Sequence, residues 1–174
     1  MSLNPQVIGK TMPHGYAGVY ARQPDMIVNT RPAGEAVLFG QALVYNANGQ
    51  VVLPAAGAKA ADFVGVAAAE VKSALNYLTQ SAGGYAADEP VSVFQRGAIN
   101  VKCQNGTAAL GGAVYLRLAA NDTLPNAVIG GFEAAADSTA GNSILLLRTN
   151  RVHIAGGRRL RRLGFALHRV HNLL

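Results

Sequence analysis

Histidines and neighbouring carboxylates are the residues of this 174-residue chain whose types and spacing could support chemistry. His168 and His171 are three residues apart, so on a helix they would share one face and could clip a metal ion. No acidic residue occurs between Arg148 and Leu174 to complete or orient such a site. Solvated side chains are therefore the preferred interpretation of these histidines, and the sequence predicts no metal site.

The adjacent acids Asp88 and Glu89 could in principle act as an acid–base pair. Neighbouring side chains in a strand point to opposite faces of a sheet, so a solvated turn is the favoured interpretation. The glycine pairs lack the order strand, Gly-x-Gly-x-x-Gly, helix that holds a pyrophosphate, and no serine lies in a Gly-x-Ser-x-Gly elbow. The single cysteine, Cys103, excludes an internal disulfide. The sequence therefore predicts no enzyme, no cofactor and no small-molecule substrate.

The composition indicates a surface that is rich in Ala, Gly, Asn, Ser and Thr and is also covered by a partner. Half of the residues are hydrophobic and only 14% are charged, against about 25% charged in ordinary soluble domains. No apolar run reaches the ~20 residues that would span a bilayer, and the N-terminus lacks the basic-then-apolar layout of a signal peptide. We expect a chain that is made in a cytoplasm and has no membrane partner.

The net charge of +6 is unevenly distributed. Up to Leu147 the chain has eight basic and nine acidic residues, whereas the segment from Arg148 to Leu174 has seven arginines and no acid. Four of these arginines are clustered after Gly156-Gly157, at Arg158, Arg159, Arg161 and Arg162. A near-neutral body therefore carries a cationic C-terminal segment.

Short strands are predicted by apolar residues that alternate with a period of two. The runs Val91–Gln95 and Ala98–Lys102 flank an expected corner at Arg96-Gly97, and Asn46–Gly49 has the composition of a hairpin turn. Further strands are expected at Ala36–Phe39, Gln41–Tyr45, Gln50–Leu53, Phe63–Ala67, Ala113–Leu118 and Ser143–Arg148. The predicted fold is mainly β, a small β-barrel or β-sandwich.

Proline, glycine and charge divide the chain into three parts. Residues 1–34 contain four prolines and predict an extended N-terminal arm, with one short strand near Ile27. Residues 35–148 form the β-barrel body, and residues 149–174 form the basic tail, which could be helical. Within the body, Glu70–Leu78 fits either a short helix or a loop with β-character.

The basic tail has three interpretations. Written as a helix, it aligns its leucines in one stripe that would dock on a neighbouring subunit. Clustered arginines also fit contact with nucleic acid or a membrane, but the tail has no aromatic platform beyond Phe165. The third interpretation is a flexible extension with solvated charges. Docking on a subunit is favoured, and nucleic acid is the less favoured partner.

Four phrases of the body, taken in order, resemble tailed-bacteriophage capsid cement (decoration) proteins. The phrases are Val37–Leu43, Phe63–Ala67, Glu89–Gly97 after Tyr85, and Gly112–Tyr115. The similarity covers about residues 20–148, and the arginine-rich tail past Gly156 is not part of the family pattern. The resemblance implies a non-enzymatic virion protein on the capsid exterior that bridges subunits of the major capsid protein. It also implies a homo-oligomer, often a trimer and sometimes a dimer.

Extended arms and tails can spread over several subunits and raise avidity. On this basis the expected capsid-binding residues lie in the arm (Tyr16, Tyr20 and Arg22) and in the tail (Arg158, Arg159, Arg161 and Arg162). Two other functions remain open. One is a small barrel that binds nucleic acid through its tail, and the other is a carbohydrate-binding barrel, which the absence of tryptophan disfavours.

Overall fold

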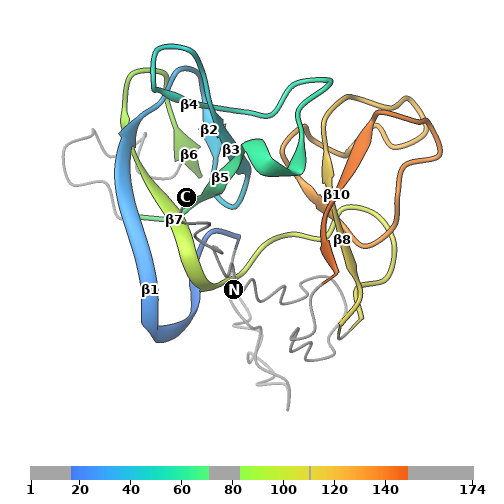
Figure 1. Ribbon diagram of the computed structural model, residues 1–174, viewed down its shortest axis with the longest axis horizontal. Helices are drawn as coiled ribbons and strands as arrows, with labels where there is room; N and C mark the ends of the chain where they lie inside the picture. Colours follow the sequence, from blue (N-terminus) through green and yellow to red (C-terminus); the bar gives the residue numbers. More distant parts are fainter. Residues whose placement is uncertain (1–16, 71–82, 110, 149–174) are drawn as a thin grey trace, which may run out of the picture.

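Three antiparallel sheets make up the described part of the chain, residues 17–70, 83–109 and 111–148 of a computed structural model (Figure 1). The predicted mainly-β class is confirmed. The strands are β1 (Tyr20–Pro32), β2 (Val37–Leu38), β3 (Ala42–Tyr45), β4 (Val51–Val52), β5 (Phe63–Ala67), β6 (Gly84–Tyr85), β7 (Pro90–Ile99), β8 (Ala113–Arg117), β9 (Phe132–Glu133) and β10 (Ser143–Arg148). One 3-10 turn, η1 (Ala60–Asp62), precedes β5.

The larger sheet has five strands in the order β1-β7-β5-β3-β4, and together with the β2–β6 pair it forms what we call the five-stranded lobe. A parallel bridge between Ala33 and Val51 places the chain leaving β1 beside β4, so the two ends of the sheet approach each other. Strand β7 is buried on both faces, because Val91 and Val93 belong to one apolar cluster and Phe94 to another.

The smaller sheet has three strands in the order β10-β8-β9, and with the loops 118–131 and 134–142 it forms the three-stranded lobe. Figure 1 shows the two lobes side by side, β1 to β7 on the left and β8 and β10 on the right. They share one apolar cluster, to which Val66 and Phe94 contribute from the first lobe and Leu116 and Phe132 from the second. The lobes therefore pack through a common core.

Local turn chemistry is confirmed at the predicted hairpin between β3 and β4. The Asn46 N–H donates to the Gln50 carbonyl (2.9 Å), and the Asn46 side-chain oxygen accepts from the N–H groups of Asn48 and Gln50, each at 2.9 Å. Gly49 has a φ of +77°, which other residue types rarely adopt. The conformation of this Asx-type turn is therefore determined by the residues of the turn and their own hydrogen bonds.

The expected corner at Arg96-Gly97 is wrong. Strand β7 runs without interruption through both residues to Ile99, and its partner β1 absorbs the irregularity through register shifts between Arg22 and Ile27. Gly97 has a φ of +115°, and a Cβ there would lie 2.8 Å from the Phe94 ring and 2.9 Å from the Asp25 carbonyl oxygen. The glycine therefore permits close approach of β1 to β7 and makes no turn.

The short strand expected near Ile27 is much longer, since β1 has 13 residues and pairs with β7 from Tyr20 to Pro32. These residues of the predicted arm are thus part of the five-stranded sheet. Residues 1–16, most of the segment proposed as a short helix, and residues 149–174 lie outside the described residues. The division into arm, body and tail stays a prediction.

Candidate partner-binding surface

Tyr20 is the one predicted contact residue whose side chain the structure describes. Its hydroxyl donates to Glu70 Oε1 (2.5 Å), and its ring lies 5.6 Å from that of Phe94, centre to centre. Burial, and next the hydrogen bond to Glu70, raise the pKa of Tyr20 above its ordinary value. The tyrosine is therefore neutral and tied into its own chain, with only part of its ring accessible to a partner.

The other predicted contacts are not tested by the structure. Arg22 lies in β1 opposite Ala98, but its side chain is outside the described part. Tyr16 lies outside the described residues, as do the four tail arginines, Arg158, Arg159, Arg161 and Arg162, and the four histidines. These residues remain predictions.

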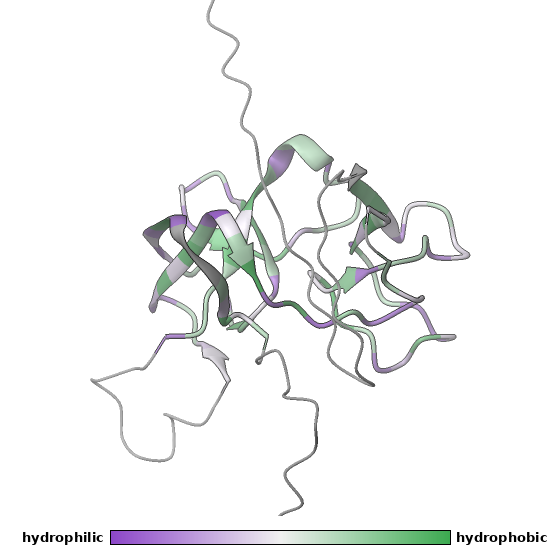
Figure 2. Ribbon diagram, turned by 90° about the horizontal axis from the view of Figure 1, so that it is seen from below, coloured by the Kyte–Doolittle hydropathy of each residue, from purple (hydrophilic) through white to green (hydrophobic). Residues whose placement is uncertain are grey.

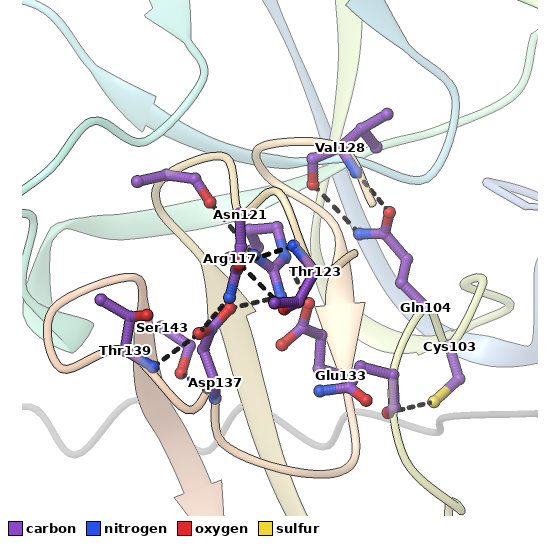
Figure 3. Close-up of polar contacts among 12 residues, drawn as sticks. Cys103, Gln104, Arg117, Asn121, Thr123, Val128, Glu133, Asp137, Thr139 and Ser143 are labelled. Atoms are coloured by element: carbon purple, nitrogen blue, oxygen red, sulfur yellow. Dashed lines mark hydrogen bonds and ion pairs between the residues drawn. The ribbon is translucent and has the colours of Figure 1, made fainter. Parts of the chain in front are cut away.

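A buried charged cluster that sequence reasoning missed organises the three-stranded lobe (Figure 3). Arg117 at the end of β8 is fully buried, and its Nε donates to Oε1 of the equally buried Glu133 on β9 (2.5 Å). Its Nη2 lies 2.8 Å from Asp137 Oδ2, and its Nη1 donates to the Ala119 carbonyl (3.2 Å). One guanidinium thus joins two strands and both long loops.

Asp137 extends the cluster along the loops. Its Oδ1 accepts from the Thr139 N–H (2.8 Å) and from Asn121 Nδ2 (2.7 Å), while its own N–H donates to Ser143 Oγ (2.9 Å). The Thr139 hydrogen bond, with those of Arg117 and Asn121, outweighs burial and lowers the pKa of Asp137. Burial alone would lower the pKa of Arg117, but its hydrogen bonds to both carboxylates raise it. Asp137 and Arg117 are therefore both charged at neutral pH.

Gln104 holds the later part of loop 118–131 through two hydrogen bonds to Val128, which we call the amide clamp. The Gln104 amide accepts from the Val128 N–H (2.5 Å) and donates to the Val128 carbonyl (3.1 Å) (Figure 3). A Cβ at Gly131 would overlap this amide, 1.3 Å from its nitrogen, so the clamp requires glycine at that position. Arg117 therefore holds the beginning of loop 118–131 at Ala119, and Gln104 holds its later part at Val128.

An open hollow of about 340 Å³ lies between the segment Lys102–Gln104 and the part of loop 118–131 from Thr123 to Ala127. Val128 beside it is 42% exposed, and Asp122 is the only charged residue from Ala119 to Gly131. Figure 2 shows hydrophobic and hydrophilic colours alternating over short distances along both lobes. A rigid surface with so little charge suits contact with another protein, since little charge must be desolvated.

The described residues contain neither a metal-binding cluster nor a membrane-spanning helix. No cluster of three or more His, Cys, Asp or Glu side chains in residues 17–70, 83–109 and 111–148 could hold a metal ion. Over the same residues, no helix is long and apolar enough to cross a membrane.

Comparison with models of protein families places the chain beside a known group of proteins. Residues 5–152, most of the chain, match the model of a family described as XM1 gp53 minor capsid protein. No curated protein matches the chain. The tail arginines from Arg158 to Arg162 lie beyond the matched residues.

Proposed function

The chain belongs to the family of the XM1 gp53 minor capsid protein, and from this premise we propose that it is a non-enzymatic protein of the capsid exterior. It binds the outside of an assembled phage capsid, where it bridges neighbouring subunits of the major capsid protein and stabilises the head. The observation that carries the proposal is the extent of the family match, residues 5–152, which takes in all three sheets.

The three-stranded lobe supports this role through its shape and charge. Long loops without secondary structure are usually either functional or disordered, and loops 118–131 and 134–142 are tied by Arg117, Asp137 and Gln104. A loop that is ordered before binding loses less conformational entropy on contact with a partner. The hollow beside Val128 is the surface that we assign to the shell.

The arm and the tail would add contacts outside this surface. We assign Tyr16, Tyr20 and Arg22 to the first set, and Arg158, Arg159, Arg161 and Arg162 to the second. Several weak contacts on one chain raise avidity many-fold through effective concentration. Self-association would multiply them again, and the family resemblance favours a trimer, with a dimer as the other arrangement.

The test is co-sedimentation of the purified full chain with capsids that lack it. Saturation at a fixed ratio to the major capsid protein is expected, and deletion of residues 156–174 should lower the affinity while leaving the saturating ratio unchanged. Val128→Asp should weaken binding, whereas Ile27→Asp, at a similarly exposed apolar residue of the other lobe, should not. Absence of saturable binding to assembled shells contradicts the proposal.

The alternative is a nucleic-acid-binding protein that acts through its tail. The observation in its favour is the cluster of four arginines between Arg158 and Arg162 in a segment without acids. Binding of this kind weakens steeply with salt, because each neutralised phosphate releases counterions. DNA affinity that depends on salt and disappears with residues 156–174, in a chain that does not bind capsids, would establish this alternative.

A further inference from the structure

The chain contains two Asn-Gly pairs, Asn48-Gly49 and Asn105-Gly106. In such a pair the backbone nitrogen of glycine lies close to the side-chain amide of asparagine, so an intramolecular attack is favoured over one by a separate molecule. Glycine has no side chain that would hinder this attack. The two dipeptides are chemically identical, so a difference in their reactivity must come from their surroundings in the fold.

The hairpin turn protects the first pair. The Gly49 N–H, whose nitrogen would attack, donates to the Asn46 carbonyl (3.1 Å). This hydrogen bond must break before the nitrogen can react. Among the described residues, no group donates a hydrogen bond to the Asn48 carbonyl. The turn therefore holds the nitrogen of Gly49 and does nothing to activate it.

The surroundings of the second pair have the opposite character. Within the described part of the chain, neither the Gly106 N–H nor the side-chain amide of Asn105 makes a hydrogen bond. The Asn105 carbonyl accepts two, from the Ala134 N–H (2.8 Å) and from the Cys103 thiol (3.3 Å from Sγ to O) (Figure 3). The thiol is farther from the Gly106 carbonyl (4.0 Å), so the Asn105 carbonyl is its nearer acceptor.

Hydrogen bonds to a carbonyl oxygen stabilise negative charge on its peptide group. The carbonyl of Asn105 and the nitrogen of Gly106 belong to the same peptide group, so both donors favour loss of the proton from that nitrogen. The fold thus leaves the attacking nitrogen free and stabilises the charge that forms on it.

We propose that the fold makes Asn105 a site of spontaneous deamidation, activated by the hydrogen bonds to its carbonyl. The Gly106 nitrogen bonds to Asn105 Cγ, the bond from Cγ to Nδ2 breaks, and ammonia leaves with the proton that the nitrogen loses. Water then opens the resulting succinimide. Attack of water at Cγ gives aspartate, and attack at the main-chain carbonyl carbon gives isoaspartate. The reaction needs only water, and the proposal does not depend on the proposed role on the capsid.

The product would alter the three-stranded lobe where its loops are held. Gln104, which forms the amide clamp, comes directly before Asn105, and its N–H donates to the Phe132 carbonyl (2.9 Å). Both products add a carboxylate next to the hollow, on a surface with little charge. Isoaspartate also lengthens the main chain by one carbon, beside the hydrogen bond from Ala134. We therefore expect isoaspartate to loosen the segment that holds Val128 and Ala134.

The two pairs provide an internal comparison for the test. The purified full chain is incubated in mildly alkaline buffer, and peptide mapping by mass spectrometry measures the conversion of each asparagine. In the folded chain Asn105 should convert about tenfold faster than Asn48, since the hydrogen bond of Gly49 must first open. In concentrated denaturant the two rates should be similar. Equal rates in the folded chain overturn the proposal, as does slower conversion of Asn105 in the folded chain than in denaturant.

Substitutions separate the parts of the proposal. Asn105→Gln keeps a side-chain amide but requires a larger ring for the attack, so conversion at this position should stop. Asn48→Gln is the matched variant and should leave the rate at Asn105 unchanged. Cys103→Ala removes one of the two donors and should slow conversion of Asn105 about two- to threefold, as expected for a weak hydrogen bond. An unchanged rate in Cys103→Ala overturns activation through the carbonyl.

Hydrogen exchange measures the effect on the loops. The isoaspartate form, separated by chromatography, is compared with Asn105→Asp, which has the added charge without the added carbon. The amides of Val128 and Ala134 should exchange faster in the isoaspartate form, while those of β3 and β5 are unchanged. Equal exchange in the two forms would contradict the expected loosening.

Discussion

The two lobes are stabilised in different ways although they share one apolar cluster. The five-stranded lobe buries apolar residues on both faces of β7, and its ion pair, Arg96 with Asp25, is exposed. The three-stranded lobe has short strands and long loops, and at its centre lies a guanidinium between two carboxylates. The difference shows that a small sheet can hold its long loops with polar contacts where apolar burial is limited. Hydrogen bonds and ion pairs are directional, so they restrict the geometry of a loop more than apolar contacts do.

The largest expected effect separates the buried cation from the exposed one. Arg117→Leu should lower the free energy of unfolding by about 3–5 kcal/mol, because two buried carboxylates lose their partner. Arg96→Leu removes an ion pair of similar length (3.0 Å) whose side chains are 47% and 75% exposed, and should cost about 0–1 kcal/mol. Chemical denaturation of both variants measures the difference, and equal losses would remove the distinction between the lobes.

A backbone change in the other lobe should be the next largest. Gly97→Ala introduces a Cβ at a φ of +115°, close to the Phe94 ring and to the Asp25 carbonyl. Strain of this kind costs roughly 1–3 kcal/mol, and it should separate β1 from β7 without affecting β8 to β10. Gly49→Ala is the matched control, since it has a positive φ but no atom within 4 Å of an added Cβ. Hydrogen exchange of the β1 amides distinguishes strain alone from strain with a clash.

Loss of the amide clamp should have a smaller and local effect. Gln104→Ala removes both hydrogen bonds to Val128, and net values for such bonds are about 0.5–1.5 kcal/mol each. The Val128 amide should exchange faster while the amides of β3 and β5 keep their protection. Exchange that accelerates equally in both lobes would mean that the loop and the common core unfold together.

Low pH should destabilise the three-stranded lobe, and high pH should destabilise the five-stranded lobe. Both effects should be smaller than those of the substitutions above. The pKa of Asp137 is lower in the folded chain than in the unfolded chain. Its contribution to stability is therefore present above its unfolded pKa, about 3.9, and is lost as the pH falls through the folded value. The pKa of Tyr20 is raised, so its contribution is present below about pH 10 and is lost as the pH rises toward the folded value.

Two substitutions assign these pH effects. Asp137→Asn should flatten the acid side of the stability curve, and Tyr20→Phe should flatten the alkaline side. Thermal unfolding followed between about pH 3 and pH 11, a range that spans both unfolded pKa values, measures both slopes. An acid slope unchanged by Asp137→Asn would transfer the effect to other carboxylates.

Elements specified by neighbouring residues were predictable. The strand expected at Phe63–Ala67 has those bounds as β5, and the turn at Asn46–Gly49 closes through its own side chain. The corner expected at Arg96-Gly97 was wrong, because glycine signals either a turn or a close approach, and the approach depends on a strand some 70 residues earlier in the chain. The division of the chain and its capsid-binding residues remain predictions.

The charged cluster was beyond sequence reasoning for the same reason. Arginine, glutamate and aspartate are almost never fully buried unless they are paired. Because Arg117 alternates with Leu116 and Leu118 in the sequence, its side chain would be expected to face outward. The sequence contains two weak signals of this cluster. Arg117 is a cation at the end of an apolar strand, and Glu133 and Asp137 are acids in a segment otherwise rich in small residues. Nothing in the spacing of Arg117, Glu133 and Asp137 indicates that they meet.

By itself the sequence determined the β class, the positions of most strands and the separation of a near-neutral body from a cationic end, because periodicity, turn chemistry and charge act over a few residues. Only the tertiary structure decided that Arg117 faces inward onto Glu133, 16 residues away, and that β1 is part of a sheet. Those outcomes depend on which distant segments pack together, and packing is decided by the whole core at once.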